Sequence, residues 1–177
     1  MKSPAYLTAA LLMAGAALAA PAAYAADISN APAALTLLDG SGFFGDAFAK
    51  NNMGNTFSDH FTFTLAAASD IDAIVSSISR NAADGLDITS LDLYNAGGLV
   101  QHGSMVSTGA VDTWTVSATA VAAGSYWLQV SGSMMSATSG AFGGATTTAA
   151  APVPEPGTYA MLLAGLGLVG ALARKRQ

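Results

Sequence analysis

The segment Phe57–Phe61 places a carboxylate between alternating aromatic residues. In an extended strand, side chains alternate between two faces, so Asp59 shares the apolar face of Phe57 and Phe61. Burying an isolated carboxylate is costly, so Asp59 is expected to accept hydrogen bonds from backbone N–H groups of the preceding loop and to fix the start of the strand. The alternative is a calcium ligand, which would need several more oxygen atoms.

Catalytic chemistry finds little support elsewhere in the chain. His60 and His102 are the only histidines, and His60 follows Asp59 directly, so in a strand the two side chains point to opposite faces. There is no G-x-S-x-G nucleophile motif. The aspartates at Asp70-x-Asp72 and Asp84-x-x-Asp87 match no complete EF-hand loop and are expected to be solvated turn acids. We therefore predict no catalytic residue, no metal ligand and no cofactor, and a protein that is not an enzyme.

Trp127 is the candidate for ligand contact. In the segment Ser125–Gly132, the residues Tyr126 and Leu128 share one parity with Val130, while Trp127 has the other. Trp114 and Tyr126 are expected in the core, whereas Trp127 could lie on an outer face and stack on a sugar ring. The sequence therefore indicates Trp127 as a candidate glycan contact.

These residues lie on segments with the period of β-strands. Thr56–Leu65 alternates most clearly, and Asp70–Ser79 fits a strand or a helix, with its β-branched residues favouring the strand. Leu86–Leu93 alternates on two parities, which predicts a bulge near Ser90. Further strands are expected at Ala33–Leu38, Ala110–Ala120 and Ser125–Gly132. The pattern predicts an all-β fold, an antiparallel β-sandwich of the jelly-roll or immunoglobulin-like kind.

The body is expected to span residues 26–139, followed by a Gly/Ala/Thr-rich segment, 140–152, that is either a tether or a weak last strand. Between residues 26 and 151, ten aspartates face only Lys50 and Arg80, a net charge of −8. This acidity argues against nucleic acid as a partner. The chain has no cysteine, which excludes disulfides and thiolate zinc sites.

The N-terminus has the pattern of a secretory signal peptide, residues 1–25. Lys2 precedes an apolar run, Ala5–Ala20, and Ala23-Tyr24-Ala25 supplies small residues at a cleavage site after Ala25. A retained N-terminal membrane helix is the alternative, but the run is short for a span.

The C-terminal residues 153–177 form a second distinct segment. Val153-Pro154-Glu155-Pro156 precedes an apolar run, Tyr159–Ala173, and then Arg174-Lys175-Arg176. As a helix, this run reaches roughly 22 Å, against about 30 Å for a bilayer core. A short, single transmembrane helix that anchors the chain temporarily in the inner membrane, with its basic residues in the cytoplasm, is therefore expected.

This order of elements resembles the PEP-CTERM sorting signal of exported bacterial proteins. The resemblance implies recognition by an integral membrane exosortase, with Pro154, Glu155 and Pro156, and the basic residues Arg174, Lys175 and Arg176, as sorting-signal residues. Phe57, Asp59 and Phe61 also match the FxDxF motif of one PEP-CTERM group, which has no assigned activity. We expect these three residues to have a structural role.

The sequence thus predicts a non-enzymatic exported protein, handled by signal peptidase and exosortase. Its expected destination is the cell surface or the extracellular matrix, in association with exopolysaccharide and biofilm. The alternative is a carbohydrate-binding module that docks matrix polysaccharide through Trp127.

Overall fold

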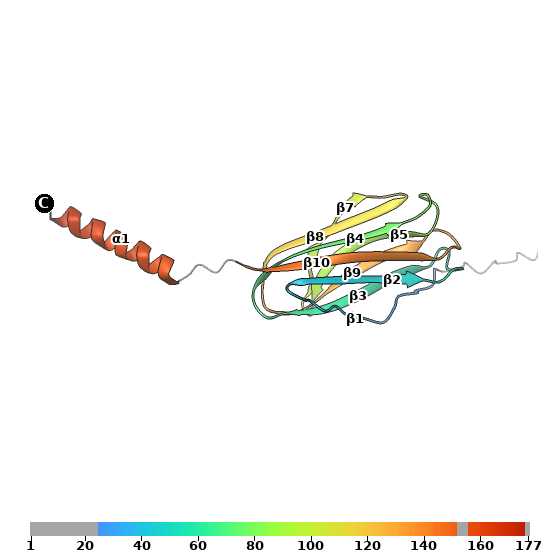
Figure 1. Cartoon of the computed structure of the whole chain (residues 1–177), viewed down its shortest axis with the longest axis horizontal. Coiled ribbons are helices and arrows are strands. Elements are labelled where there is room, and N and C mark those ends of the chain that lie inside the picture. Colours follow the sequence, from blue (N-terminus) through green and yellow to red (C-terminus); the bar gives the residue numbers. More distant parts are fainter. Residues whose placement is uncertain (1–24, 152–155, 176–177) are drawn as a thin grey trace, which may run out of the picture.

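The computed structural model describes residues 25–151 and 156–175 (Figure 1). The expected signal peptide, except for Ala25, lies outside the described residues. The described residues form ten strands and one helix: β1 Ala33–Ala34, β2 Ser41–Phe48, β3 Thr56–Leu65, β4 Ser69–Ile78, β5 Leu86–Asn95, β6 Gly98–His102, β7 Ser104–Ser107, β8 Val111–Val121, β9 Gly124–Met134, β10 Gly140–Ala150 and α1 Pro156–Arg174.

The strands form two five-stranded sheets. The first sheet has the order β1-β3-β9-β5-β6, and the second has the order β2-β10-β4-β8-β7. All strand pairs are antiparallel except β1 with β3, which is parallel. Figure 1 shows the strands of the two sheets running side by side in one elongated body, with α1 outside it.

Alternating side chains build the core between the sheets. In β3, Phe57, Asp59, Phe61, Phe63 and Leu65 are buried while their neighbours are half-buried or exposed. Aromatic rings meet across the two sheets: Phe44 lies 5.0 Å from Phe61, and Phe48 lies 4.5 Å from Phe57, centroid to centroid. The sheets therefore pack face to face in a sandwich-like arrangement, because each has one apolar face to bury.

Several expected strands are confirmed. β3 covers Thr56–Leu65, β4 replaces the helix alternative over Ser69–Ile78, and the register of β5 against β9 shifts between Ile88 and Ser90. The bulge moves Leu91 and Leu93 onto the buried face that Ile88 occupies, as the change of parity predicts.

The expected tether is wrong for most of its length. Gly140–Ala150 forms β10, which lies inside the second sheet and pairs with both β2 and β4. Glycine and alanine are poor strand formers, but β10 forms because neighbouring strands supply backbone hydrogen bonds on both of its sides. The body therefore extends beyond residue 139.

The C-terminal apolar run forms α1, as a helix was expected there. Many of its large apolar residues are exposed, among them Met161, Leu163 and Leu168. Within the described residues, no helix combines the length and the apolar character that a membrane span requires. The 19 residues of α1 include four glycines and end in Arg174, which lowers their mean hydropathy.

Candidate functional site

The outward face of the first sheet carries a cluster of aromatic rings. Strand pairing places Trp127 of β9 opposite Tyr94 of β5 on one side and Thr62 of β3 on the other. The Tyr94 and Trp127 rings stack at 5.6 Å with an interplanar angle of 6°. His60 of β3 lies 5.9 Å from Trp127, tilted by 37°. We call His60, Tyr94 and Trp127 the aromatic cluster.

Trp127 is on the outer face, as its parity predicts, but it is not a freely exposed ring. Tyr94 and His60 lie close to it and leave it half-buried. Its indole N–H is buried and has no hydrogen-bond partner among the described residues. An unpaired buried donor is uncommon, because it loses its hydration without compensation. Because the N–H itself is buried, an acceptor reaches it only if a neighbouring side chain moves aside.

Polar side chains line the sheet beside the aromatic cluster. The His60 Nε2 and Gln129 Oε1 atoms are 3.0 Å apart, on adjacent strands. One strand further, the Asp92 carboxylate lies 3.1 Å from His102 Nδ1 and accepts the Gly103 N–H, also at 3.1 Å. Asp92 is 6% exposed, and these two contacts compensate for the burial of its charge. This row offers both donors and acceptors to a ligand on the face.

On the other side of Trp127 the surface is hollowed. A depression of about 490 Å³ is lined by Trp127, by residues of β1 and β3, and by Ser125 and Ala96. Thr64 and Ser125, paired across β3 and β9, present exposed hydroxyl groups there. An apolar wall with a few hydroxyl groups is the usual composition of a small-molecule site.

Asp59 lies on the opposite, buried face of β3. It is 2% exposed, and its Oδ1 accepts the Asn30 N–H at 2.7 Å. The donor is therefore the N-terminal segment 29 residues upstream, not the expected loop before β3. Next to it, the Ser29 hydroxyl accepts the Ser58 N–H at 2.7 Å. Asp59 thus holds the N-terminal segment against β3.

The second carboxylate oxygen of Asp59, Oδ2, is buried and lacks a hydrogen-bond partner in the described part of the chain. Burial raises the pKa of Asp59 above its ordinary value of 3.8, and the negative charge of Asp46 adds to this, while the Asn30 N–H and His60 oppose it. The described residues contain no group of three or more His, Asp or Glu side chains placed to hold a metal ion.

The other candidate aspartates lie in different kinds of secondary structure. Asp70 and Asp72 lie in β4 and not in a turn, so that expectation was wrong, although Asp72 is exposed. Asp84 does lie in a turn, where it accepts hydrogen bonds from Ser136 and Thr138 at 2.6 and 2.7 Å. These bonds lower the pKa of Asp84, so its ionised carboxylate accepts the hydrogen bonds that stabilise the turn.

The sorting-signal residues fall at the limits of the described chain. Pro154, Glu155 and Arg176 lie outside the described residues. Pro156 is the first residue of α1, where proline is favoured because its missing N–H would have no helical partner. Arg174 is the last residue of α1, and the Lys175 N–H donates to the Ala171 carbonyl at 3.3 Å.

Comparison with known proteins locates one family signature. Residues 152–177 match the PEP-CTERM protein-sorting motif. This motif implies an exported protein that is processed by an exosortase after a membrane-anchored intermediate. No curated protein matches the chain.

Two solved structures are similar to the body. One is the Aeromonas hydrophila periplasmic inhibitor of g-type lysozyme, PliG, with 15% identity and a TM-score of 0.45, covering 70% of this chain and 100% of that one. The other is the pre-peptidase C-terminal domain of a Bacillus anthracis collagenase, with 17% identity and a TM-score of 0.36, covering 70% of this chain and 94% of that one.

Proposed function

We propose that this chain is a non-enzymatic exported protein that an exosortase delivers to the cell surface or the extracellular polysaccharide matrix. The observation that carries the proposal is the sorting motif at residues 152–177. The acidic, cysteine-free body supports it, since a net charge of −8 between residues 26 and 151 favours solubility and disfavours anionic partners. Signal peptidase and exosortase are the partners during export, and exopolysaccharide of a biofilm is the surrounding material.

Changing the Pro-Glu-Pro segment tests the sorting step. In cells that contain an exosortase, we expect Glu155→Ala to abolish C-terminal processing, so that the precursor stays with the membrane fraction. The measurement is cell fractionation with the intact mass of the released protein. Asp72→Asn, which removes an exposed carboxylate from the body, is the matched control and should be processed normally. Normal processing and release of Glu155→Ala would contradict the proposal.

The aromatic cluster favours a second function within the first, the binding of polysaccharide by the outer face of the first sheet. Trp127 forms one wall of the 490 Å³ hollow, and the Thr64 and Ser125 hydroxyls and the His60–Gln129 pair supply polar groups around it. Sugar rings combine apolar C–H faces with hydroxyl groups, so a mixed surface of this kind suits them.

We expect Trp127→Ala to weaken binding to the extracellular polysaccharide of the producing cells at least tenfold, because it removes the wall of the hollow. The measurement is a binding isotherm on the isolated polysaccharide, with circular dichroism to confirm folding. Met53→Ala is the control, since Met53 is a large apolar residue 69% exposed in the turn before β3. Equal affinity of Trp127→Ala and the unchanged chain would remove this second function.

Two finer features of the chain are also proposed, its strand topology and its family group. We propose a jelly-roll topology, supported by the strand orders β2-β10-β4-β8 and β3-β9-β5-β6, which place β2 beside β10 and β3 beside β9 as two interlocked Greek keys do. We also propose membership in the FxDxF group, supported by Phe57, Asp59 and Phe61 pointing together into the core.

A further inference from the structure

The outward face of the second sheet is largely apolar and uncharged. Two rows of large side chains cross it. One row contains Phe43 and Ile74, 84% and 45% exposed, and the other contains Ile78 and Val111, 81% and 43% exposed. Between them runs a row of small residues, Gly45, Gly143, Ser76 and Thr113, in register on β2, β10, β4 and β8. The order of these rows is apolar, small, apolar.

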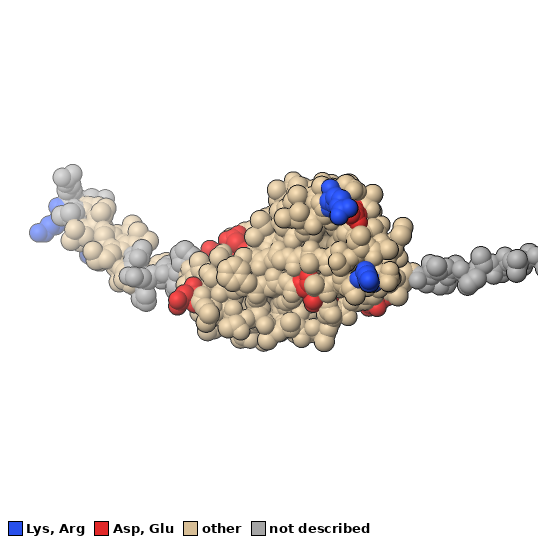
Figure 2. Space-filling view, turned by 45° about the vertical axis from the view of Figure 1, so that its right-hand side comes forward, with Lys and Arg blue, Asp and Glu red and all other residues tan. Residues whose placement is uncertain are grey.

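Charges of opposite sign lie near the two ends of the second sheet. β2 and β4 are parallel to each other because each is antiparallel to β10. Lys50 and Arg80, two residues beyond their ends, therefore lie at one end, and Asp39 and Asp72 lie at the other. Figure 2 shows both basic side chains of the body toward the end distant from α1, although acidic residues, including Asp84 near Arg80, occur there too.

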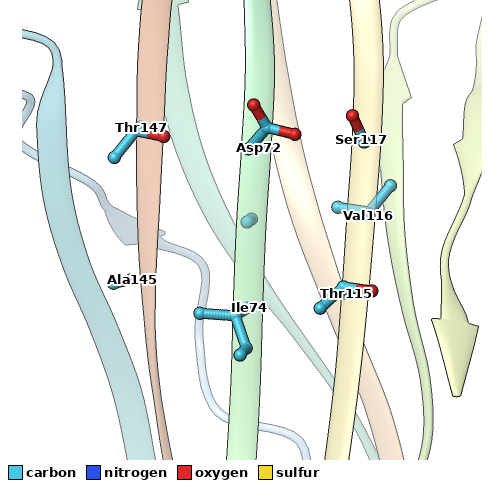
Figure 3. Close-up of a pocket in the computed structure, with 8 residues that line it drawn as sticks. Asp72, Ile74, Thr115, Val116, Ser117, Ala145 and Thr147 are labelled. Carbon is cyan, nitrogen blue, oxygen red and sulfur yellow. The ribbon is translucent and has the colours of Figure 1, made fainter. Parts of the chain in front are cut away.

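The face is also hollowed beside the Ile74 row. A depression of about 360 Å³ is lined by Asp72 and Ile74 of β4, Thr115 and Ser117 of β8, and Ala145 and Thr147 of β10. Figure 3 shows these side chains on three neighbouring strands, with Asp72, Thr147 and Ser117 at one level and Ile74, Ala145 and Thr115 near the next. A projecting aliphatic side chain such as Ile78 would fit this depression.

We propose that this face binds a second copy of the chain, face to face and antiparallel, about a two-fold axis near Ser76. The axis lies midway between Asp72 and Arg80, which are eight residues, or about 26 Å, apart along the strand direction. A half-turn about it places the Phe43–Ile74 row over the partner's Ile78–Val111 row. The same rotation places Asp39 and Asp72 beside the partner's Lys50 and Arg80.

Complementarity of charge identifies a second copy as the occupant. The body as a whole carries −8 and would repel itself in most orientations, but this arrangement brings its only two cations against carboxylates. The strands of the second sheet cover about 700 Å², from their spacing and rise. That is close to the roughly 800 Å² per partner of a stable interface. The aromatic cluster on the first sheet stays free in such a dimer.

Charge reversal in two complementary variants tests the proposal with the full chain in mild detergent. Lys50→Glu with Arg80→Glu makes both ends acidic, and Asp39→Lys with Asp72→Lys makes both ends basic. We expect each variant alone to dimerise at least tenfold more weakly than the unchanged chain in analytical ultracentrifugation. A 1:1 mixture should recover the dimer, because each variant then faces opposite charge.

A cysteine near the axis gives a second readout, since the chain has no native cysteine. Gly143→Cys should form an intermolecular disulfide on mild oxidation, whereas Thr64→Cys on the first sheet should not. Association that is equal in all charge variants, with no recovery specific to the mixture, would assign it to α1 and overturn the proposal. A monomeric unchanged chain at micromolar concentration would also overturn it.

Discussion

Replacing Gly144 with alanine should destabilise the folded body by about 3 kcal/mol, because the added methyl group has no room. Gly144 lies on the inner side of β10, where a Cβ atom would lie 2.5 Å from the Ile74 carbonyl oxygen and would also meet the Phe44 ring. The carbonyl belongs to the paired strand β4 and cannot move away without disturbing the sheet. A loss of this size corresponds to roughly 10 °C in Tm, measurable by thermal unfolding.

The neighbouring residue provides the control. Gly143 points to the outer face of the same strand, and a Cβ atom there would meet no described atom within 4 Å. Gly143→Ala should leave Tm unchanged or raise it slightly, since alanine reduces the freedom of the unfolded chain. Similar destabilisation by both substitutions would mean that the backbone of β10, and not the space above Gly144, determines the effect.

The strands that the sequence predicts well are those with one apolar face. In β3, phenylalanines alternate with small polar residues, so the period of two is visible without any partner strand. β10 lacks this signal because Gly144 lies on the inner face, where Phe44 fills the space that a side chain would occupy. Gly144 allows close packing because it has no side chain. From composition alone, however, a glycine-rich segment indicates a flexible chain.

Of the aromatic cluster, the sequence predicts only the position of Trp127. The parity of Trp127 against Tyr126 and Leu128 places it on the outer face, and the structure agrees. Tyr94 and His60 lie 33 and 67 residues away in the sequence, and only the pairing of β9 with β5 and β3 brings them to Trp127. Because register is set by long-range pairing, no local pattern could assemble the aromatic cluster.

The two faces of the sandwich-like body therefore differ in character. The first sheet presents aromatic and polar side chains, whereas the second presents apolar rows with opposite charges near the ends of its strands. The proposed polysaccharide and dimer contacts use opposite faces, so a dimer would carry two polysaccharide sites pointing away from each other. Such a bivalent unit could cross-link chains of a matrix, and its avidity would exceed that of one site.

Asp59→Asn is expected to stabilise the protein at neutral pH by on the order of 1 kcal/mol, because an unpaired buried charge costs more than an unpaired neutral group. The asparagine oxygen can still accept the Asn30 N–H, and the amide NH₂ at the position of Oδ2 is also without a partner but carries no charge. Phe57 and Phe61 keep their positions because the two side chains have nearly the same shape. The measurement is denaturant unfolding of both proteins across a range of pH.

The pH dependence distinguishes the removal of charge from other effects of the substitution. Because burial raises the pKa of Asp59 above 3.8, the folded protein binds this proton more tightly than the unfolded chain does. The stability that the proton contributes is complete below about pH 3.8 and is lost as the pH rises through the raised pKa. The advantage of Asp59→Asn should therefore be small in acid, grow through that interval and stay constant above it. Asp27→Asn is the control of opposite sign: hydrogen bonds from Ser29 lower the pKa of Asp27, so removing that carboxylate gives no advantage at neutral pH. An advantage of Asp59→Asn that is equal at every pH would show that Asp59 is already neutral, or that its charge finds compensation in the folded state.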